Sequence, residues 1–392
     1  MSDEVIVVGA GPAGSTVALL LARAGVRVRI LERTPFPRRK VCGEYLNAGA
    51  VLALARLGAL DAVRAAGSPL RGVRLVAAGA APVALPFPAP ALACARERLD
   101  ALLLDAACAA GAQVERARVD EVLRAGDRCV GVRARDERGE TVERSARIVV
   151  GADGTGSLVA RRLDLARNSR RGARWAVGGH YAGLGALEGR IEMYVGGGAY
   201  FALNPLDATT TNVMVVVPRA RLAQWSADLE AGVGAAAATL AHGARSFAGT
   251  TRLGARVSVG PLSHDVRGLW APGALLVGDA AGFLDPFTGQ GVALALLDAE
   301  HAADAVLAAL GAPASESAAF AAYARERVRD RVWRGRLARL VALLVDVPPL
   351  ARRASARLAR MPELGATLLE GLAGTIAPQR ALRIDVLARL LA

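Results

Sequence analysis

Short apolar runs, each followed by a glycine-rich turn, occur at three widely spaced places in the chain. They are residues 5–8, 148–150 and 274–277. Apolar runs of this length that end at glycine predict fully buried strands of a parallel sheet. Another strand is predicted at 26–31, so the chain begins with a strand, a glycine turn, a helix and a second strand.

Segments with alternating apolar and polar residues lie between these runs. The segments at 114–122, 129–134 and 140–146 predict a small antiparallel meander. Further strand signals lie at 70–94, which prolines interrupt, at 173–217 and near 250–258. Because these segments separate the glycine-bounded strands, we expect a discontinuous nucleotide-binding domain with a second sheet inserted into it.

Helical periodicity predicts the remaining elements. Asn47 precedes a helical segment and is a suitable N-cap for it. The predicted helices lie at about 47–57, 96–110, 219–244 and 291–310, and the region from 315 to the end is almost wholly helical apart from a break at Pro348 and Pro349.

The first glycine turn has the spacing of a dinucleotide-binding unit. Residues 9–14 read Gly-Ala-Gly-Pro-Ala-Gly, and Glu32 follows the next strand. In such a unit Gly9 makes the tight turn, Gly11 lets the backbone approach a pyrophosphate and Gly14 lets the helix pack on the strand. Glu32 is placed to accept hydrogen bonds from a ribose. The sequence therefore predicts a bound dinucleotide.

Charge adds little to this interpretation. The formal net charge of the 392-residue chain is +13, but Lys40 is the only lysine and the arginines are scattered. This pattern is typical of a GC-rich genome and lacks the basic runs of a nucleic-acid-binding protein, so we exclude that function.

Cysteine usage and the N-terminal residues bear on the compartment. No cysteine pair has CxxC spacing and no histidine lies at metal-ligand spacing, so we predict neither a disulfide framework nor a metal site. Asp3 and Glu4 stand where a secretory signal would be basic, and no apolar run is long enough to span a membrane. We expect a cytoplasmic protein. The cysteines are Cys42, Cys94, Cys108 and Cys129.

Three motifs in fixed order resemble a known family. They are residues 9–14 with Glu32, Gly-Ala-Asp-Gly-Thr-Gly-Ser at 151–157, and Gly-Asp-Ala-Ala-Gly-Phe at 278–283 followed by Asp-Pro-Phe-Thr-Gly-Gln-Gly at 285–291. Over about residues 4–310 the chain resembles the flavin-dependent hydroxylases of the para-hydroxybenzoate hydroxylase class and their relatives, the geranylgeranyl reductases and flavin-dependent halogenases. Each motif alone is unspecific, whereas the ordered set is specific.

The resemblance implies an α/β fold in which a discontinuous Rossmann-like FAD-binding domain carries an inserted, mostly antiparallel substrate sheet and a helical C-terminal region. The expected boundaries are 1–70, 95–172 and 260–310 for the FAD-binding domain, 71–94 and 173–259 for the substrate sheet, and 311–392 for the helical region.

The resemblance also implies FAD as the cofactor and NADPH or NADH as a transient electron donor. Asp279 would bind the ribityl hydroxyls, and the 286–291 segment would surround the pyrimidine edge with backbone N–H groups. Asp153 and Gly154 would support the pyrophosphate region and the nicotinamide. Simpler roles stay open, as a helix N-cap for Asp279 and a plain turn at Asp153. The predicted cofactor-binding residues are Gly9, Gly11, Pro12, Ala13, Gly14, Glu32, Arg33, Arg98, Asp153, Gly154, Gly278, Asp279, Pro286, Gly289, Gln290 and Gly291.

One of these residues depends on the register of the predicted helix at 96–110. The resemblance implies that an arginine at its start reaches the flavin. Arg98 fits the spacing better, and Arg96 is the alternative. A solvated helix face with Arg–Asp pairs is a further interpretation that stays open.

Candidate catalytic residues are Cys42 and His180. The Cys42-Gly43 pair resembles the geranylgeranyl reductases, in which it lies near the reactive face of the flavin. A buried cysteine and a satisfied core histidine are the simpler alternatives. The predicted substrate-pocket residues are Tyr45, Tyr200, Phe201, Asn204 and Pro205.

The reaction stays open between two classes of enzyme. A monooxygenase would hydroxylate or epoxidise a lipophilic aromatic, quinone-like or polyketide-derived molecule through a flavin hydroperoxide, with dioxygen as co-substrate. A geranylgeranyl-reductase-like enzyme would reduce or oxidise carbon–carbon double bonds of a lipid. The intact 151–157 segment and the lack of a membrane span favour oxygenation by a small margin, and a non-catalytic flavoprotein sensor is a third alternative.

Two related sequence features narrow the function and the partners. The chain lacks the Trp-x-Trp-x-x-Pro segment of the halogenases, and its only lysine is Lys40 in a basic loop, so we exclude that branch. The arginine-rich C-terminal helices are open to peripheral membrane contact or to packing on their own domain. We expect a monomer or a homodimer.

Overall fold

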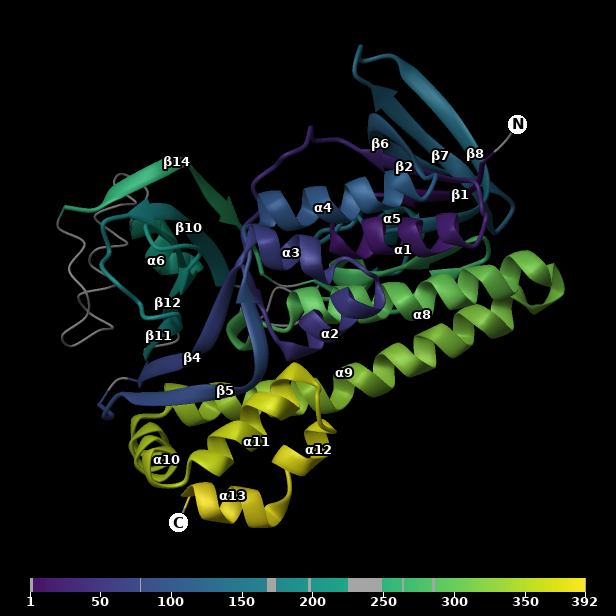
Figure 1. The fold of residues 1–392 in the computed structure, drawn as a ribbon. Coiled ribbons are helices and arrows are strands. Elements are labelled where there is room, and N and C mark those ends of the chain that lie inside the picture. Colours follow the sequence, from purple (N-terminus) through teal and green to yellow (C-terminus); the bar gives the residue numbers. More distant parts are fainter. Residues whose placement is uncertain are drawn as a thin grey trace.

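A computed structural model describes residues 3–77, 79–167, 174–196, 199–224, 249–262, 264–283 and 286–391. Two sheets lie next to each other, and the C-terminal helices lie along one side of both (Figure 1).

The first sheet contains the glycine-bounded strands. In it β6, β2, β1, β8 and β17 pair in parallel in that order, and β16 pairs antiparallel with β17. The rest of β6 forms an antiparallel meander with β7 and the first half of β8. The bounds are β1 Asp3–Val8, β2 Val28–Glu32, β6 Gln113–Ala125, β7 Arg128–Asp136, β8 Thr141–Gly151, β16 Trp270–Ala271 and β17 Ala274–Leu276.

Helices α4 (Arg96–Ala109), α1 (Pro12–Arg23) and α8 (Gly291–Gly311) pack side by side along this sheet (Figure 1). Their small and aliphatic residues are buried with the strands in the largest hydrophobic core. Short elements connect these layers: α2 Ala48–Arg56, α3 Leu60–Ala66, α5 Leu158–Arg162, the β9 (Ala166–Arg167) and β15 (Asp265–Val266) pair, and the 3-10 turns η1 Gly278–Ala281, η2 Pro286–Thr288 and η3 Pro313–Ser315.

The second sheet has the order β14-β10-β13-β12-β11-β4-β5-β3. All of its pairings are antiparallel except β11 with β4. Its bounds are β3 Tyr45–Leu46, β4 Ser68–Ala77, β5 Val83–Ala93, β10 Arg174–Ala182, β11 Arg190–Gly196, β12 Ala199–Pro205, β13 Thr210–Pro218 and β14 Thr251–Val259, with α6 Arg219–Gln224 after β13.

The C-terminal region is helical and joins both sheets. The first half of α9 (Glu316–Asp346) packs in the core of the first sheet through Phe320 and Tyr323. Its second half packs with Leu85 of the second sheet. The helices that follow are α10 Pro348–Arg360, α11 Pro362–Ala373, α12 Pro378–Ala381 and α13 Ile384–Leu391.

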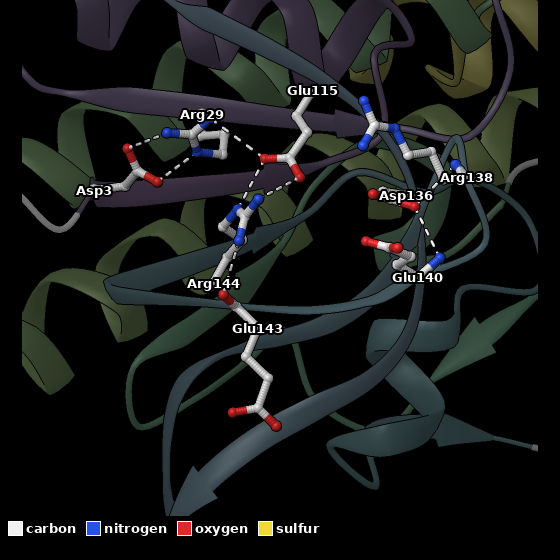
Figure 2. Close-up of polar contacts among 8 residues, drawn as sticks. All are labelled: Asp3, Arg29, Glu115, Asp136, Arg138, Glu140, Glu143 and Arg144. Atoms are coloured by element: carbon white, nitrogen blue, oxygen red, sulfur yellow. Dashed lines mark hydrogen bonds and ion pairs between the residues drawn. The ribbon is translucent and has the colours of Figure 1, made fainter.

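The amino ends of the first sheet carry a chain of ion pairs (Figure 2). Arg29 on β2 donates to Asp3 on β1 at 2.6 Å and to Glu115 on β6 at 3.3 Å. Arg144 on β8 donates two hydrogen bonds of 2.9 Å to the carboxylate of Glu115. Each of these four side chains has an opposite charge beside it. The ion pairs therefore link the strands at this end of the sheet.

The fold class expected from the sequence is confirmed. Asn47 caps α2 by accepting a hydrogen bond from the Ala50 backbone at 3.0 Å, as its position predicted. Part of the helix predicted at 219–244 is seen as α6, and the rest lies outside the described residues. The division into domains stays a prediction. Strand β3 lies within residues 1–70, which we assigned to the FAD-binding domain, but it pairs in the second sheet.

Candidate functional site

The three glycine motifs meet at the carboxyl ends of the first sheet. A Cβ added to Gly9, whose φ is +102°, would lie 2.6 Å from the carbonyl oxygen of Ala152. A Cβ on Gly278 would lie 2.9 Å from the Cβ of Ala13. The close approaches show that these turns pack directly on one another and need glycine there. The arrangement is the ligand-binding end of a parallel sheet.

The N-terminus of α1 is available to an anion. The N-cap residue of α1 is Gly11, which has no side chain that could cap the helix. The carboxylate of Glu32 accepts hydrogen bonds of 2.9 Å from the backbone of Ala10 and of Thr34, and so holds the turn from β2. Free N–H groups and the positive end of the helix dipole favour a phosphate at this point.

Arg38 lies beside this helix N-terminus with unused donors. Its Nη2 is 3.5 Å from Glu32 and 3.6 Å from Asp100, and the residue is 7% exposed. Its Nε and Nη1 have no hydrogen-bond partner among the described residues. Burial lowers the pKa of Arg38. A buried guanidinium with unpaired donors destabilises the protein unless a ligand accepts hydrogen bonds from them. Arg38 is therefore the clearest sign of an anion-binding site.

Lys40 is close enough to this cluster to feel its charge. Lys40 is exposed overall, but partial desolvation and the charges of Arg38, Arg96 and Arg33 lower its pKa, and Glu32 opposes them. Arg33, which the sequence singled out, is exposed.

Asp153 follows β8 and binds the first turn of α5, whose N-cap is Ser157. Its carboxylate accepts hydrogen bonds from the Ser157 hydroxyl at 2.5 Å and from the Leu158 backbone at 2.6 Å. Gly154 follows with a φ of +78°. The carboxylate of Asp153 is thus hydrogen-bonded within its own turn, and the role of Asp153 and Gly154 toward a cofactor stays a prediction.

The turn after β17 presents Asp279 between two glycines of positive φ, Gly278 at +60° and Gly282 at +111°. Burial raises the pKa of Asp279, whereas Arg331 and Arg96 act to lower it. The ring of His264 hydrogen-bonds the carbonyl of Ala280 at 2.9 Å and braces the same turn.

The segment after this turn contacts Tyr45 and Asn47. Gly289, whose φ is +63°, packs so closely on the ring of Tyr45 that a Cβ would clash with it. The side chain of Asn47 donates to the carbonyl of Gly289 at 3.3 Å. Gln290 is buried, and its Oε1 has no partner among the described residues. Gly289 therefore lies against β3, and Pro286, Gln290 and Gly291 belong to the same segment between η2 and the start of α8.

Residues 42–44 form a loop that the second sheet holds in place. Asn212 donates to the carbonyl of Cys42 at 2.8 Å, and Asn204 donates to the carbonyl of Gly43 at 2.9 Å. The Nε2 of His180 lies 2.8 Å from the carboxylate of Glu44. Strands β13, β12 and β10 each supply one of these contacts, so the loop marks where the two sheets meet.

The structure distinguishes the two arginines at the start of α4. Arg98 is exposed and donates to the carbonyl of Ala66 at 3.0 Å. Arg96 pairs with the buried Asp100 through bonds of 2.7 and 2.8 Å. It also interacts with the Cys42 thiol and lies within electrostatic reach of Asp279. The geometry favours Arg96 for contact with a ligand at this place.

An aromatic wall closes the same region. Tyr200 is buried, and its ring meets that of Phe287 edge-on at 5.2 Å between centroids. Burial raises the pKa of Tyr200, and the charge of Arg174 opposes this effect. Phe201 faces the other way, into a hydrophobic cluster with Tyr194. Pro205 ends β12 just after Asn204.

A shallow surface hollow is lined in part by Tyr45. Tyr45 stacks on Phe87 with 5.4 Å between ring centroids. The other lining residues are mainly apolar and belong to α2, β5 and α11.

Sequence reasoning missed several residues of this site. Arg38 belongs to a basic loop that the sequence showed, but its burial depends on Asp100 from another helix. Arg327 and Arg331 of α9 bind Asp298 of α8 at 2.9 Å each. Asp298 was the available signal, since a lone aspartate on the apolar face of an alanine- and leucine-rich helix needs a buried cationic partner.

Known proteins resemble the chain over most of its length. The menaquinone reductase of Mycolicibacterium smegmatis is 28% identical over 381 residues, covering 88% of this chain and 85% of that protein. A probable electron transfer flavoprotein-quinone oxidoreductase, YdiS of Escherichia coli, is 31% identical over 373 residues, covering 85% and 84%. The structure of the flavin-dependent brominase Bmp2 superposes with a TM-score of 0.85 at 21% identity, covering 97% and 98%.

The family comparison agrees with the geometry of the three turns. Residues 2–334 match the family described as FAD binding domain. The chain is a member of this FAD-binding family, and it is an FAD-dependent oxidoreductase.

Proposed function

We propose that this protein is a flavin-dependent reductase that passes electrons from NADPH or NADH to a lipophilic acceptor of quinone or isoprenoid type. The observation that carries the proposal is the 42–44 loop, which the second sheet holds in place with the Cys42 thiol beside Arg96. The reductase and quinone oxidoreductase that match over most of the chain support it.

The residues present fit FAD. The two free donors of Arg38 and the uncapped N-terminus of α1 suit the pyrophosphate. Asp279 suits the ribityl hydroxyls, and the turn at 286–291 suits the pyrimidine edge. Arg96 replaces Arg98 as the arginine we assign to the flavin, because only Arg96 lies beside Cys42 and within reach of Asp279.

When bound, FAD supplies the hydride that such a reduction needs. The chain has to supply a proton, and the Cys42 thiol is placed to do so. Burial raises the pKa of Cys42, against the opposing effects of Arg96 and the Glu44 backbone, so that the group is a thiol at neutral pH. The Glu44–His180 pair lies next to it and orients the loop through the 2.8 Å contact.

A monooxygenase is the second candidate. Buried aromatic residues such as Tyr200 line the region and would exclude water, which protects an oxygenating flavin from wasteful reaction. The sequence favoured this reaction by a small margin, and the nearly full-length quinone-linked relatives shift the balance toward reduction. The likeness to the brominase concerns the fold alone.

Product analysis with and without oxygen tests the choice. Purified holoprotein, NADPH or NADH and a short-chain menaquinone would be incubated anaerobically and aerobically, with mass spectrometry of the products. We expect a product two hydrogens heavier in both conditions. A product one oxygen heavier that forms only in air would contradict the proposal and support the monooxygenase.

Variants of Cys42 test the proton donor. We expect Cys42→Ala to retain FAD. Its kcat should fall about tenfold to a thousandfold, because general acid catalysis is lost. Because the pKa of Cys42 is raised, wild-type activity should persist into the alkaline range and fall only as the thiol ionises. Cys108→Ala is the matched control, since Cys108 is exposed and far along α4. An unchanged kcat in Cys42→Ala would remove Cys42 from the mechanism.

We also propose that the C-terminal region contacts anionic membranes, where such a substrate resides. Residues 312–392 carry 14 arginines and seven acidic residues, a net charge of +7. Exposed aliphatic side chains accompany them, including Val332, Leu343 and Ile384, the last 85% exposed. No described helix is long and apolar enough to cross a membrane.

Sedimentation with vesicles tests this contact. We expect binding to vesicles of phosphatidylglycerol and phosphatidylcholine that weakens at high salt. Equal binding to pure phosphatidylcholine, or none to either, would contradict it.

A further inference from the structure

One face of α9 follows the polypeptide from β17 to the end of the Asp279 turn. Its residues 316, 323, 327 and 331 recur at intervals of seven and four, which places them in one stripe along the helix. Each binds a successive point of the neighbouring segment. Glu316 accepts from the Gly273 backbone at 2.8 Å, and the hydroxyl of Tyr323 donates to the carbonyl of Leu276 at 2.7 Å.

The last two members of the stripe bind the turn itself. Arg327 donates to the carbonyl of Gly278 at 3.0 Å, and Arg331 donates to the carbonyl of Gly282 at 2.8 Å. These two glycines flank Asp279 and have positive φ. Both guanidinium groups also bind Asp298 of α8, which is 2% exposed. The turn is thus fixed at both ends by a side chain from a distant helix.

The charges in this cluster do not cancel. Two arginines share one buried aspartate, and Asp279 is the next carboxylate within their reach. The groups that face Asp279 are Arg327 and Arg331 from α9, Asp298 from α8 and Arg96 from α4, while the ring of His264 binds the neighbouring Ala280 carbonyl. Burial raises the pKa of Asp279, and Arg331 is the group that lowers this pKa most.

We propose that Arg331 is a positioning residue for the cofactor: it fixes the Gly282 end of the turn that presents Asp279 to FAD. Its positive charge also favours the carboxylate form of Asp279. Arg327 fixes the other end through the Gly278 carbonyl, with a longer hydrogen bond of 3.4 Å to the Gly282 carbonyl, and Asp298 limits the excess charge. The inference rests on FAD as the cofactor and is independent of whether the reaction is reduction or oxygenation. Helix α9 is then part of the flavin site, although it follows all three glycine motifs in the sequence.

The affinity for FAD and its pH dependence test the proposal. FAD would be titrated into apoprotein and followed by quenching of flavin fluorescence, from pH 5 to pH 9. For Arg331→Gln we expect a Kd at least about tenfold higher at pH 7, the scale of one charge-assisted hydrogen bond. The pH below which binding is lost should rise, because Asp279 loses the positive charge that lowers its pKa most. Arg331→Lys should restore that pH midpoint while recovering only part of the affinity.

The matched control is Arg329→Gln. Arg329 lies two residues away on the same helix, is exposed and contacts Glu326. We expect its Kd and pH midpoint to equal those of the wild type. A Kd of Arg331→Gln within twofold of this control would overturn the proposal.

A second variant separates charge from loss of structure. Asp298→Asn keeps the shape of the cluster and removes the negative charge, so the arginines act more strongly on Asp279. We expect its pH midpoint to fall, opposite in direction to Arg331→Gln, and this test stands even if Arg331→Gln fails to fold. A rise of the midpoint in both variants would mean a merely structural cluster and would overturn the proposal.

Discussion

The two ends of the first sheet use charge in opposite ways. At the amino ends, Arg29 and Arg144 are matched by Asp3 and Glu115 (Figure 2). At the carboxyl ends, Arg38 is buried with two free donors. Complete pairing requires nothing further, whereas buried donors without partners are destabilising until a ligand binds them. The contrast locates the cofactor without reference to any relative.

The largest effect is expected at the carboxyl ends, from Gly14→Ala. The added Cβ would clash with the carbonyl oxygen of Gly9 and lie 3.0 Å from the Cβ of Ala152. We expect loss of most bound FAD and a destabilisation of about 1–3 kcal/mol, as overpacking usually gives. Flavin absorbance per protein and thermal unfolding measure both. Gly311→Ala is the control, because no atom lies within 4 Å of its added Cβ. Full FAD content in Gly14→Ala would show that the turn can shift.

Arg38→Gln should come next, with opposite effects on binding and stability. We expect the Kd for FAD to rise by about tenfold to a hundredfold, since charged hydrogen bonds to the pyrophosphate are lost. The apoprotein should be at least as stable as the wild type, because two buried donors without partners are removed while Glu32 and Asp100, whose contacts with Arg38 are long at 3.5 and 3.6 Å, keep their other hydrogen bonds. Fluorescence titration and thermal unfolding of apoprotein would be compared with Arg39→Gln, whose arginine pairs with Glu97. A less stable Arg38→Gln apoprotein would mean that Arg38 has a structural role.

Glu316→Gln should affect the stability of the apoprotein as a function of pH. Burial acts to raise the pKa of Glu316, but the hydrogen bonds from Arg128 and Gly273 outweigh it and lower this pKa. A lowered pKa means that the stabilisation is complete above the unfolded-state pKa and is lost as the pH falls through the folded-state value. We expect the variant to be less stable by about 1 kcal/mol at pH 7. The difference from wild type should shrink below about pH 4, as measured by urea unfolding. A constant difference across this range would contradict the assignment.

The smallest effect is expected at the amino ends, from Arg144→Gln. Its pair with Glu115 is partly exposed, so the loss should be at most about 1 kcal/mol and should decrease further in high salt. The Kd for FAD should not change. A weaker affinity for FAD in this variant would end the contrast between the two ends.

What the sequence predicted well was local. The turn at 9–14 and Glu32 form one continuous unit, and the cap at Asn47 lies next to its helix. These features depend on neighbours in the chain, so their spacing was enough. The order of the three motifs also predicted that their turns would meet, and Gly9 and Gly278 confirm this.

What the sequence could not give depended on distant contacts. Arg96 and Arg98 both begin α4, and only the position of Cys42 and Asp100 distinguishes them. Arg331 stands in a helix rich in arginine, and nothing local separates it from the exposed Arg329. Their difference arises because one faces Asp298 and the other faces solvent.

The length of α9 has a practical consequence for engineering chimeric enzymes. Similarity to the family ends at residue 334, which lies inside this 31-residue helix. A junction there would divide a single rod whose first half grips one sheet and whose second half packs against the other. Exchanges of the C-terminal region between relatives should therefore be joined at η3, before the helix begins, so that donor and recipient each contribute an unbroken helix.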